Sequence, residues 1–132
     1  MADDTRVAIR SDTDIVIARQ KGRALAAHLG FSSTDQTLIA TAISEVARNI
    51  LRYAKTGEIR FQTETNGKAA MTIVAHDEGP GIPDVAVALQ NGYSTSGSLG
   101  MGLPGSKRIM DEFMIVSEVG KGTTVTMKKR RN

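Results

Sequence analysis

The segment from residue 58 to residue 76 constrains the fold more than any other part of this chain. Residues 58–65 and 68–76 each alternate between apolar and polar side chains, as strands do when one face is buried. Asn66 and Gly67 stand between them, and this dipeptide is the strongest short hairpin signal because both residues tolerate the positive φ that a tight turn needs. The two strands are therefore expected to pair antiparallel.

The other elements are expected from apolar spacing and from helix-capping residues. Ser11 or Asp12 can cap a helix whose apolar side chains recur every three or four residues up to Gly30, a residue type that commonly follows a helix end. In chain order we expect a strand at 5–10, this first helix, a second helix beginning after Ser33 and Thr34 and ending near Ala54, the hairpin, a short helix at 84–90, a long helix at 103–111, and a closing hairpin of strands at 113–119 and 123–129. Helices grouped with a mixed, mostly antiparallel sheet predict an α+β fold, a two-layer α/β sandwich with space for a ligand between the layers.

Length and composition limit the classes of function. A chain of 132 residues, 40% apolar and 23% charged, predicts one soluble domain over 1–132, too short to include a separate substrate domain. It has no cysteine, no apolar segment like that of a signal peptide at its N-terminus, and no apolar run long enough to span a membrane. We expect a cytoplasmic protein without membrane association, disulfide bonds or thiolate–metal sites. Part of the net charge of +3 comes from basic residues at 128–131, expected to form a solvated terminus, and with only 4% aromatic residues no nucleic-acid partner is predicted.

Residues 100–108, GMGLPGSKR, satisfy one phosphate-binding pattern and narrowly miss another. Gly100, Gly102 and Gly105 fit G-x-G-x-x-G, but a dinucleotide-binding loop follows a buried strand directly, and residues 93–99 do not resemble a strand. A P-loop lysine follows the last glycine, whereas here Ser106 precedes Lys107. The stretch is either a flexible loop before a helix or another kind of phosphate site, since free N–H groups and the helix dipole favour anions at a helix start.

Glu45 and Asn49 are four residues apart in the second expected helix, so they share a face at the margin of its apolar arc. A carboxylate and an amide oxygen in this place suit a hard cation such as Mg²⁺, which keeps several waters and takes further ligands from phosphate. The alternative is a polar helix edge with an i,i+4 hydrogen bond.

Asp77 ends an apolar strand and enters a loop that contains Gly79 and Gly81. Its carboxylate could accept a hydrogen bond from an amino group in a pocket, such as adenine N6, and the glycines would let the backbone approach a flat base. The alternative is an Asx-type turn without a ligand.

Together these segments resemble a known superfamily. E-x-x-x-N on a helix, D-x-G-x-G after a strand and G-x-G-L at a helix start are similar to the N, G1 and G2 boxes of the GHKL ATPase/kinase superfamily, whose late threonine element is matched by Gly122-Thr123-Thr124. Four segments most resemble bacterial serine/threonine kinases of partner switching, above all the stressosome switch kinases: ISEVARNILRYA, HDEGPGI, LGMGLPGSKRIMDEF and GKGTTV. Anti-sigma-factor serine kinases are their relatives. The resemblance extends from Ile43 to Val125 and implies the Bergerat fold.

The resemblance assigns roles to individual residues. Asn49 would coordinate Mg²⁺, and Glu45 would act near the metal as the general base that activates the attacking hydroxyl. The residues that would hold the phosphates of ATP are Gly100, Met101, Gly102 and Leu103. Residues 91–99, which correspond to the lid of the family, contain no lysine or arginine, so charge neutralisation falls to Mg²⁺, to backbone N–H groups, or to Lys107 and Arg108.

The same resemblance places the base of the nucleotide. Asp77 would bind adenine N6, Gly79 and Gly81 would shape the base pocket, and Thr123 would support the base edge through water. Tyr53 departs from the pattern, because many relatives have histidine at this position after the N box.

The activity implied is ATP-dependent phosphorylation of a serine or threonine on STAS-domain proteins of the stressosome. After release, a kinase of this kind also binds and activates a PP2C-type phosphatase. Two alternatives stay open: an anti-sigma-factor serine kinase that binds a sigma factor and phosphorylates its STAS-domain antagonist, and a nucleotide-sensitive binding module that needs no turnover.

Overall fold

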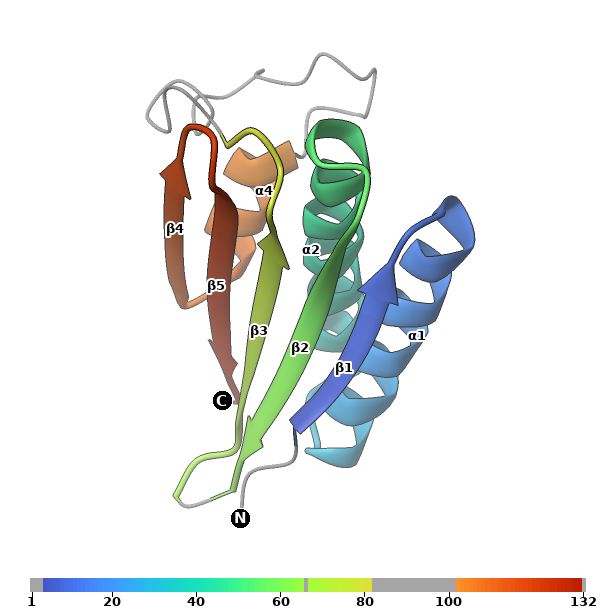
Figure 1. Cartoon of the computed structure of the whole chain (residues 1–132). Helices are drawn as coiled ribbons and strands as arrows, with labels where there is room; N and C mark the ends of the chain where they lie inside the picture. Colours follow the sequence, from blue (N-terminus) through green and yellow to red (C-terminus); the bar gives the residue numbers. More distant parts are fainter. Residues whose placement is uncertain (1–3, 66, 82–101, 132) are drawn as a thin grey trace.

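The computed structural model describes residues 4–65, 67–81 and 102–131, which form three helices and five strands (Figure 1). In chain order these are β1 (Asp4–Ile9), α1 (Asp12–His28), α2 (Ser33–Tyr53), β2 (Gly57–Glu64), β3 (Ala70–Asp77), α4 (Gly102–Ile109), β4 (Glu112–Glu118) and β5 (Gly122–Arg130). The helix expected at 84–90 and the segment 91–99 lie outside the described residues.

The five strands form one sheet in the order β1-β2-β3-β5-β4, and every pairing among them is antiparallel. The three helices cover one face of this sheet (Figure 1). The predicted α+β two-layer fold is confirmed, and the described strands include no parallel pair that would make the sheet mixed.

Short polar side chains set the helix ends. Ser11 is the N-cap of α1, where the carboxylate of Asp14 accepts hydrogen bonds from the backbone N–H of Arg10 and of Ser11 at 2.8 and 3.2 Å. Gly30, at φ +86°, follows the end of α1 as predicted. The second helix starts earlier than expected, at residue 33, because the cap is Ser32, whose Oγ accepts a hydrogen bond from the residue 35 N–H at 3.1 Å.

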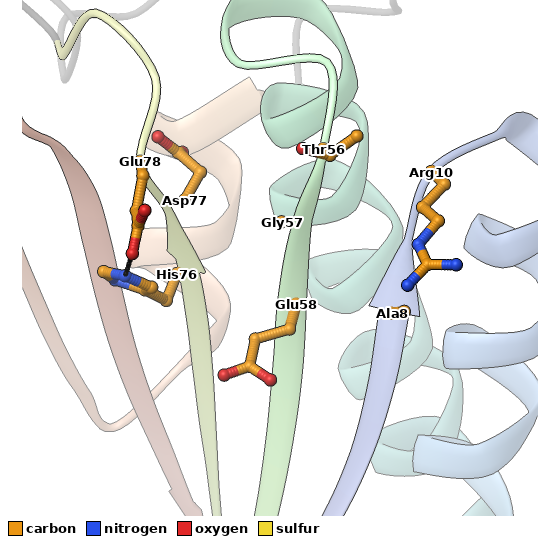
Figure 2. A pocket seen from close by; sticks show the side chains of 8 residues that line it. All are labelled: Ala8, Arg10, Thr56, Gly57, Glu58, His76, Asp77 and Glu78. Carbon is orange, nitrogen blue, oxygen red and sulfur yellow. Dashed lines mark ion pairs between the residues drawn. The ribbon is translucent and has the colours of Figure 1, made fainter.

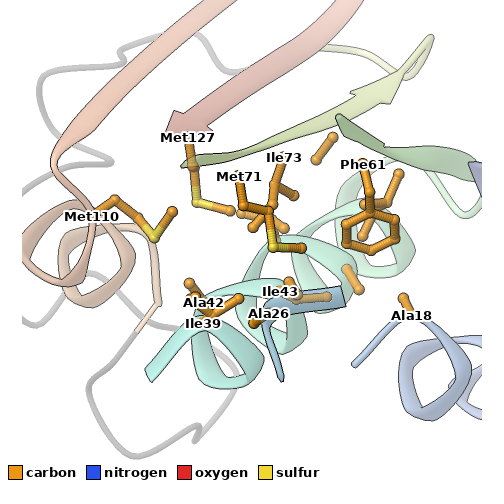
Figure 3. Close-up of a cluster of buried hydrophobic side chains, with 14 of the residues drawn as sticks. Ala18, Ala26, Ile39, Ala42, Ile43, Phe61, Met71, Ile73, Met110 and Met127 are labelled. Carbon is orange, nitrogen blue, oxygen red and sulfur yellow. The ribbon is translucent and has the colours of Figure 1, made fainter. Parts of the chain in front are cut away.

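The core lies between the helices and the sheet (Figure 3). Its fully buried members include Ile43 of α2, Phe61 of β2 and Ile73 of β3. Complete burial of one such side chain stabilises the fold by about 1.5–3 kcal/mol. Gly22 lets α1 approach α2, because a Cβ at this position would lie 2.1 Å from Ile43 Cδ1.

Helix α4 is shorter than the long helix expected at 103–111. The helix ends at Ile109, and two residues later the carboxylate of Asp111 accepts a hydrogen bond from Arg130 N at 2.7 Å while its N–H donates to Lys128 O at 2.9 Å. These two bonds join the end of α4 to β5, so that the chain turns directly into β4.

The strand expected at 123–129 is confirmed and extends to Arg130, so the basic residues at 128–131 are not a solvated tail. Lys128, Lys129 and Arg130 belong to β5, and Arg131 donates its backbone N–H to Ala69 O at 2.8 Å. Their charged groups are also bound. Lys128 forms an ion pair with Glu64 and Arg130 one with Glu112. Lys129 donates to the Ile109 carbonyl and Arg131 to the Leu29 carbonyl. Strand pairing holds this segment because β5 lies between β3 and β4.

Candidate nucleotide site

Four of the predicted motifs meet at one end of the molecule. The C-terminal half of α2, the end of β3, the turn between β4 and β5 and the start of α4 all lie at the upper end in Figure 1. The antiparallel order of the strands causes this, because β3 ends where β5 begins.

Asp77 is the last residue of β3 and is 5% exposed. Its neighbours across the sheet are Gly57 on β2 and Thr123 on β5. Asp77 Oδ1 accepts a hydrogen bond from Gly79 N at 3.0 Å, which is the Asx-type turn considered above. The turn occupies one carboxylate oxygen, and a carboxylate has further acceptor capacity for a ligand's amino group. The two interpretations of Asp77 are therefore compatible.

Thr123 lies beside Asp77 in the sheet and is equally buried. Its Oγ1 is 2.8 Å from the Oγ of Ser117 on β4, and Ser117 Oγ also donates to the Gly122 carbonyl at 3.3 Å. The Thr123 hydroxyl is thus held in place by the hairpin that contains it.

Several backbone segments pack so closely around Asp77 that only glycine fits at the contact points. Gly122 has φ +124°, and a Cβ there would lie 2.1 Å from Asp77 O. A Cβ at Gly79 would lie 2.5 Å from the Cβ of Ala54, at the end of α2. Gly57 and Gly122 were not among the predicted site residues, although a glycine within or at the start of a strand can indicate such an approach.

The loop after Asp77 is also fixed from the other side. Gly81 has φ +81°, and a Cβ there would lie 2.4 Å from Glu118 O. The N–H of Gly120, in the β4–β5 turn, donates to Pro80 O at 2.8 Å. The loop that contains Gly79 and Gly81 is therefore packed between the end of α2 and this turn.

Glu45 and Asn49 both lie in the C-terminal half of α2, as predicted. Glu45 is buried, with 8% exposure, and Asn49 is half-buried. Glu45 Oε1 forms an ion pair with Arg48 Nη1 at 2.6 Å, an i,i+3 contact that the sequence interpretation did not include. Further along the helix, the Arg52 guanidinium lies 5.8 Å from the ring centre of Tyr53, a cation–π contact.

A metal at this end would take few ligands from the described side chains. Within residues 4–65, 67–81 and 102–131, no three acidic, histidine or cysteine side chains gather in a way that could hold an ion. Mg²⁺ fits such a donor set better than metals that need an all-protein cage, because it keeps several waters and binds substrate phosphates.

The predicted phosphate residues are described only in part. Gly100 and Met101 lie outside the described residues, while Gly102 and Leu103 are the first two residues of α4. Lys107 and Arg108 lie in the last turn of this eight-residue helix, at the end opposite Gly102.

A hollow of about 370 Å³ opens near the end of β3 (Figure 2). His76 and Glu78, which line it, approach within 4.0 Å of each other, and His76 Nδ1 is 2.8 Å from Thr124 Oγ1. Side chains alternate along a strand, so His76 and Asp77 point to opposite faces of the sheet. Asp77 and its neighbour Gly57 nevertheless both line the hollow, so it reaches the strand ends at which the candidate site lies.

Comparison with known proteins identifies the family. Residues 10–129 match the histidine kinase-like ATPase domain. The chain belongs to this family. It is 52% identical over 126 residues to the serine/threonine-protein kinase RsbT of Bacillus subtilis (strain 168), covering 95% of both chains. It is 32% identical over 124 residues to the anti-sigma F factor of Geobacillus stearothermophilus, covering 85% of this chain and 81% of the relative.

Several solved structures share the fold at low sequence identity. The RsbU and RsbW domains of Rv1364c from Mycobacterium tuberculosis superimpose with a TM-score of 0.66 and 18% identity, over 98% of this chain and 32% of that longer one. The mycobacterial sensor histidine kinase MprB gives a TM-score of 0.57 and 12% identity, over 100% and 99% of the two chains.

The GHKL prediction is confirmed, as is the prediction of a serine/threonine-protein kinase, by the family match and the RsbT relative. An ATPase and kinase domain also implies the use of ATP. No described helix is both long and apolar enough to cross a membrane.

Proposed function

We propose that this kinase, acting in the cytoplasm as one domain, transfers phosphate from Mg·ATP to a serine or threonine of a STAS-domain stressosome protein. Once released from that partner, it binds and activates a PP2C-type phosphatase. The 52% identity to RsbT over nearly the whole chain supports this pathway. The observation that carries the site is the buried carboxylate of Asp77 beside Thr123, at the end of the sheet where α2, the helix of Glu45 and Asn49, also ends.

In this proposal Asp77 recognises adenine, the base of the nucleotide. The Gly79 N–H donates a hydrogen bond to Asp77 Oδ1 at 3.0 Å, which fixes the orientation of the carboxylate. Its remaining acceptor capacity then serves adenine N6. Gly79 and Gly81 shape the adenine pocket, because only glycine lets this loop pack closely against Ala54 and Glu118. Thr123, held by Ser117, supports the base edge through water.

Asn49 holds Mg²⁺ together with Glu45 in this proposal, and the ion supplies charge neutralisation on the β- and γ-phosphates. Gly100, Met101, Gly102 and Leu103 bind the phosphates through their backbone at the start of α4. Free N–H groups at a helix N-terminus favour anions. Lys107 and Arg108 are weak candidates for the γ-phosphate, since both lie in the last turn of α4.

Glu45 is the proposed general base. Its carboxylate accepts the proton of the substrate hydroxyl while the hydroxyl oxygen attacks the γ-phosphorus and the bond to the ADP oxygen breaks. Little covalent chemistry is required of the protein in such a transfer, so positioning and electrostatics supply most of the rate.

The second candidate function is an anti-sigma-factor serine kinase, which the 32% identical anti-sigma F factor favours. It predicts a direct complex with a sigma factor. The third alternative is a nucleotide-sensitive binding module that needs no turnover, and the variant Glu45→Ala distinguishes it from both kinases. If the protein is such a module, Glu45→Ala would leave partner binding and phosphatase activation unchanged.

The proposal is tested by incubating the chain with ATP, Mg²⁺ and purified STAS-domain proteins and locating phosphate by mass spectrometry. We expect one phosphorylated serine or threonine with the wild type, and no transfer after chelation of Mg²⁺ with EDTA. Absence of transfer to every STAS protein, or equal transfer in EDTA, would contradict the proposal.

A further inference from the structure

Two cationic side chains near the end of β5 bind the C-terminal ends of two helices. Lys129 Nζ donates a hydrogen bond to the carbonyl of Ile109, the last residue of α4, at 3.0 Å. Arg131 Nη1 donates in the same way to Leu29 O, at the C-cap of α1, at 3.1 Å. The last carbonyls of a helix have no partner within the helix, and a cation there also complements the negative end of the helix dipole. The two contacts are therefore alike in chemistry but act on different helices.

The Lys129 side chain differs from its neighbours in the direction it takes. Lys128 and Arg130 lie on the uncovered face of the sheet, where each forms an ion pair with a glutamate. Lys129 lies on the other face, is half-buried against the helices, and forms no ion pair with an acidic side chain among the described residues. The end of α4, not a counter-charge, therefore holds its ammonium group.

The end of α4 needs this contact because it has no glycine cap. Gly30 follows α1 at φ +86°, the left-handed conformation that commonly ends a helix. Met110 and Asp111 follow α4 instead, and the bonds of Asp111 to β5 fix the chain after the helix. The contact of Lys129 is with the helix itself, since Ile109 is the last helical residue.

The opposite end of α4 carries the proposed phosphate site, at Gly102 and Leu103. Eight residues at about 1.5 Å per residue make this helix about 12 Å long, and it packs against α2 (Figure 1). A shift at Ile109 therefore moves the N–H groups at the start of so short a helix as well. These groups tolerate little displacement, because a hydrogen bond to a phosphate oxygen requires a donor–acceptor distance of about 2.7–3.2 Å.

We propose that Lys129 is a positioning residue for phosphate binding, which orients α4 by binding its last carbonyl. This inference rests on the proposed function, in which the start of α4 binds the phosphates of ATP, and adds the residue that holds this helix from its far end. Strand β5 then serves both parts of the nucleotide. Thr123 near its start supports the base, and Lys129 near its end holds the helix that binds the phosphates.

Lys129→Met tests this role, because methionine keeps most of the length of the side chain and removes the charged donor. Arg131→Met is the matched control, since it removes the like contact at the end of α1. Calorimetry measures the affinities for Mg·ATP and, by competition, for adenosine, which has no phosphate. We expect Lys129→Met to weaken ATP binding by about fivefold or more and adenosine binding by less than about twofold. Arg131→Met should leave both affinities within about twofold of the wild type.

Lys129→Arg keeps a charged donor and should restore ATP affinity to within about threefold of the wild type. If urea unfolding shows that Lys129→Met does not fold, Lys129→Gln takes its place and should bind ATP at least threefold more weakly than Lys129→Arg does. The role would be overturned by ATP affinity within twofold of the wild type in Lys129→Met, by equal losses of ATP and adenosine binding, or by an equal loss in Arg131→Met. Equal ATP affinities of Lys129→Gln and Lys129→Arg would overturn it as well.

The affinities of the wild type separate this inference from the function on which it rests. If the wild type binds ATP no more tightly than adenosine, the phosphate site proposed at the start of α4 fails. If it binds ATP more tightly and Lys129→Met keeps the same ratio of the two affinities, only the positioning role of Lys129 fails.

Discussion

Replacement of Asp77 by asparagine separates base recognition from the folding role of this residue. The Gly79 N–H donates to Oδ1 at 3.0 Å, and an asparagine would keep its carbonyl oxygen there to accept the same hydrogen bond. The amide NH₂ would then take the place of Oδ2. A donor would face adenine N6, which is itself a donor.

The magnitude follows from the lost hydrogen bond. A hydrogen bond to a charged group contributes about 1.5–3 kcal/mol, and each 1.4 kcal/mol is about tenfold in affinity. We therefore expect Asp77→Asn to weaken ATP binding by roughly 10- to 150-fold. Inosine triphosphate has an acceptor, O6, in place of the amino group, so the variant should bind it at least as well as the wild type does.

Isothermal titration calorimetry with both nucleotides measures these affinities. Urea unfolding is the control, and the free energy of unfolding should change by no more than about 1 kcal/mol because the bond from Gly79 persists. ATP affinity within threefold of the wild type, or an unchanged preference for ATP over inosine triphosphate, would refute the placement of adenine against Asp77.

Two further substitutions test the surroundings of this carboxylate. Gly122→Ala should lower the free energy of unfolding by about 2–4 kcal/mol, because of backbone strain and a 2.1 Å approach of the new Cβ to Asp77 O. The control Gly120→Ala, at φ +84° with open space around it, should lower it by about 1 kcal/mol. Urea unfolding measures both values, and equal losses would show that close packing against Asp77 is not the cause. Ser117→Ala removes the 2.8 Å contact with Thr123 Oγ1 and should weaken ATP binding about three- to tenfold without changing kcat, a result contradicted by unaltered nucleotide affinity.

The elements that sequence alone predicted well are those determined by local interactions. The hairpin at 58–76 pairs in the expected antiparallel manner because the alternation along both strands is local. Its pairing ends at Glu64 opposite Ala70, so the connection is longer than the tight turn expected at Asn66 and Gly67. The start of α2 was displaced because Ser32, Ser33 and Thr34 are three successive residues of the kind that cap helices, and local sequence does not distinguish among them.

The errors involve contacts between distant parts of the chain. The end of α4 depends on Asp111 meeting Arg130, nineteen positions later, and the basic segment 128–131 is held by partners on β2, on α4, on β4 and just after the end of α1. No local pattern encodes such pairs.

At the candidate site, the sequence predicted the elements on which residues lie but not their contacts. Glu45 and Asn49 lie on α2 and Asp77 ends β3, as helix and strand periodicity led us to expect, while their roles stay predictions. The ion pair between Glu45 and Arg48 was not predicted, since i,i+3 and i,i+4 neighbours are both within reach on a helix and side-chain conformation decides between them.

The most direct test of the central claim is single-turnover phosphate transfer by Glu45→Gln, measured at saturating Mg·ATP with a STAS-domain protein that the wild type phosphorylates. Glutamine preserves the size of the side chain and removes the base. The account predicts at least a 100-fold lower transfer rate, in line with the 10²–10⁴-fold typical of general-base catalysis, with ATP affinity within about threefold. Transfer within about tenfold of the wild-type rate would contradict Glu45 as the base, since a loss that small lies below the range of such catalysis.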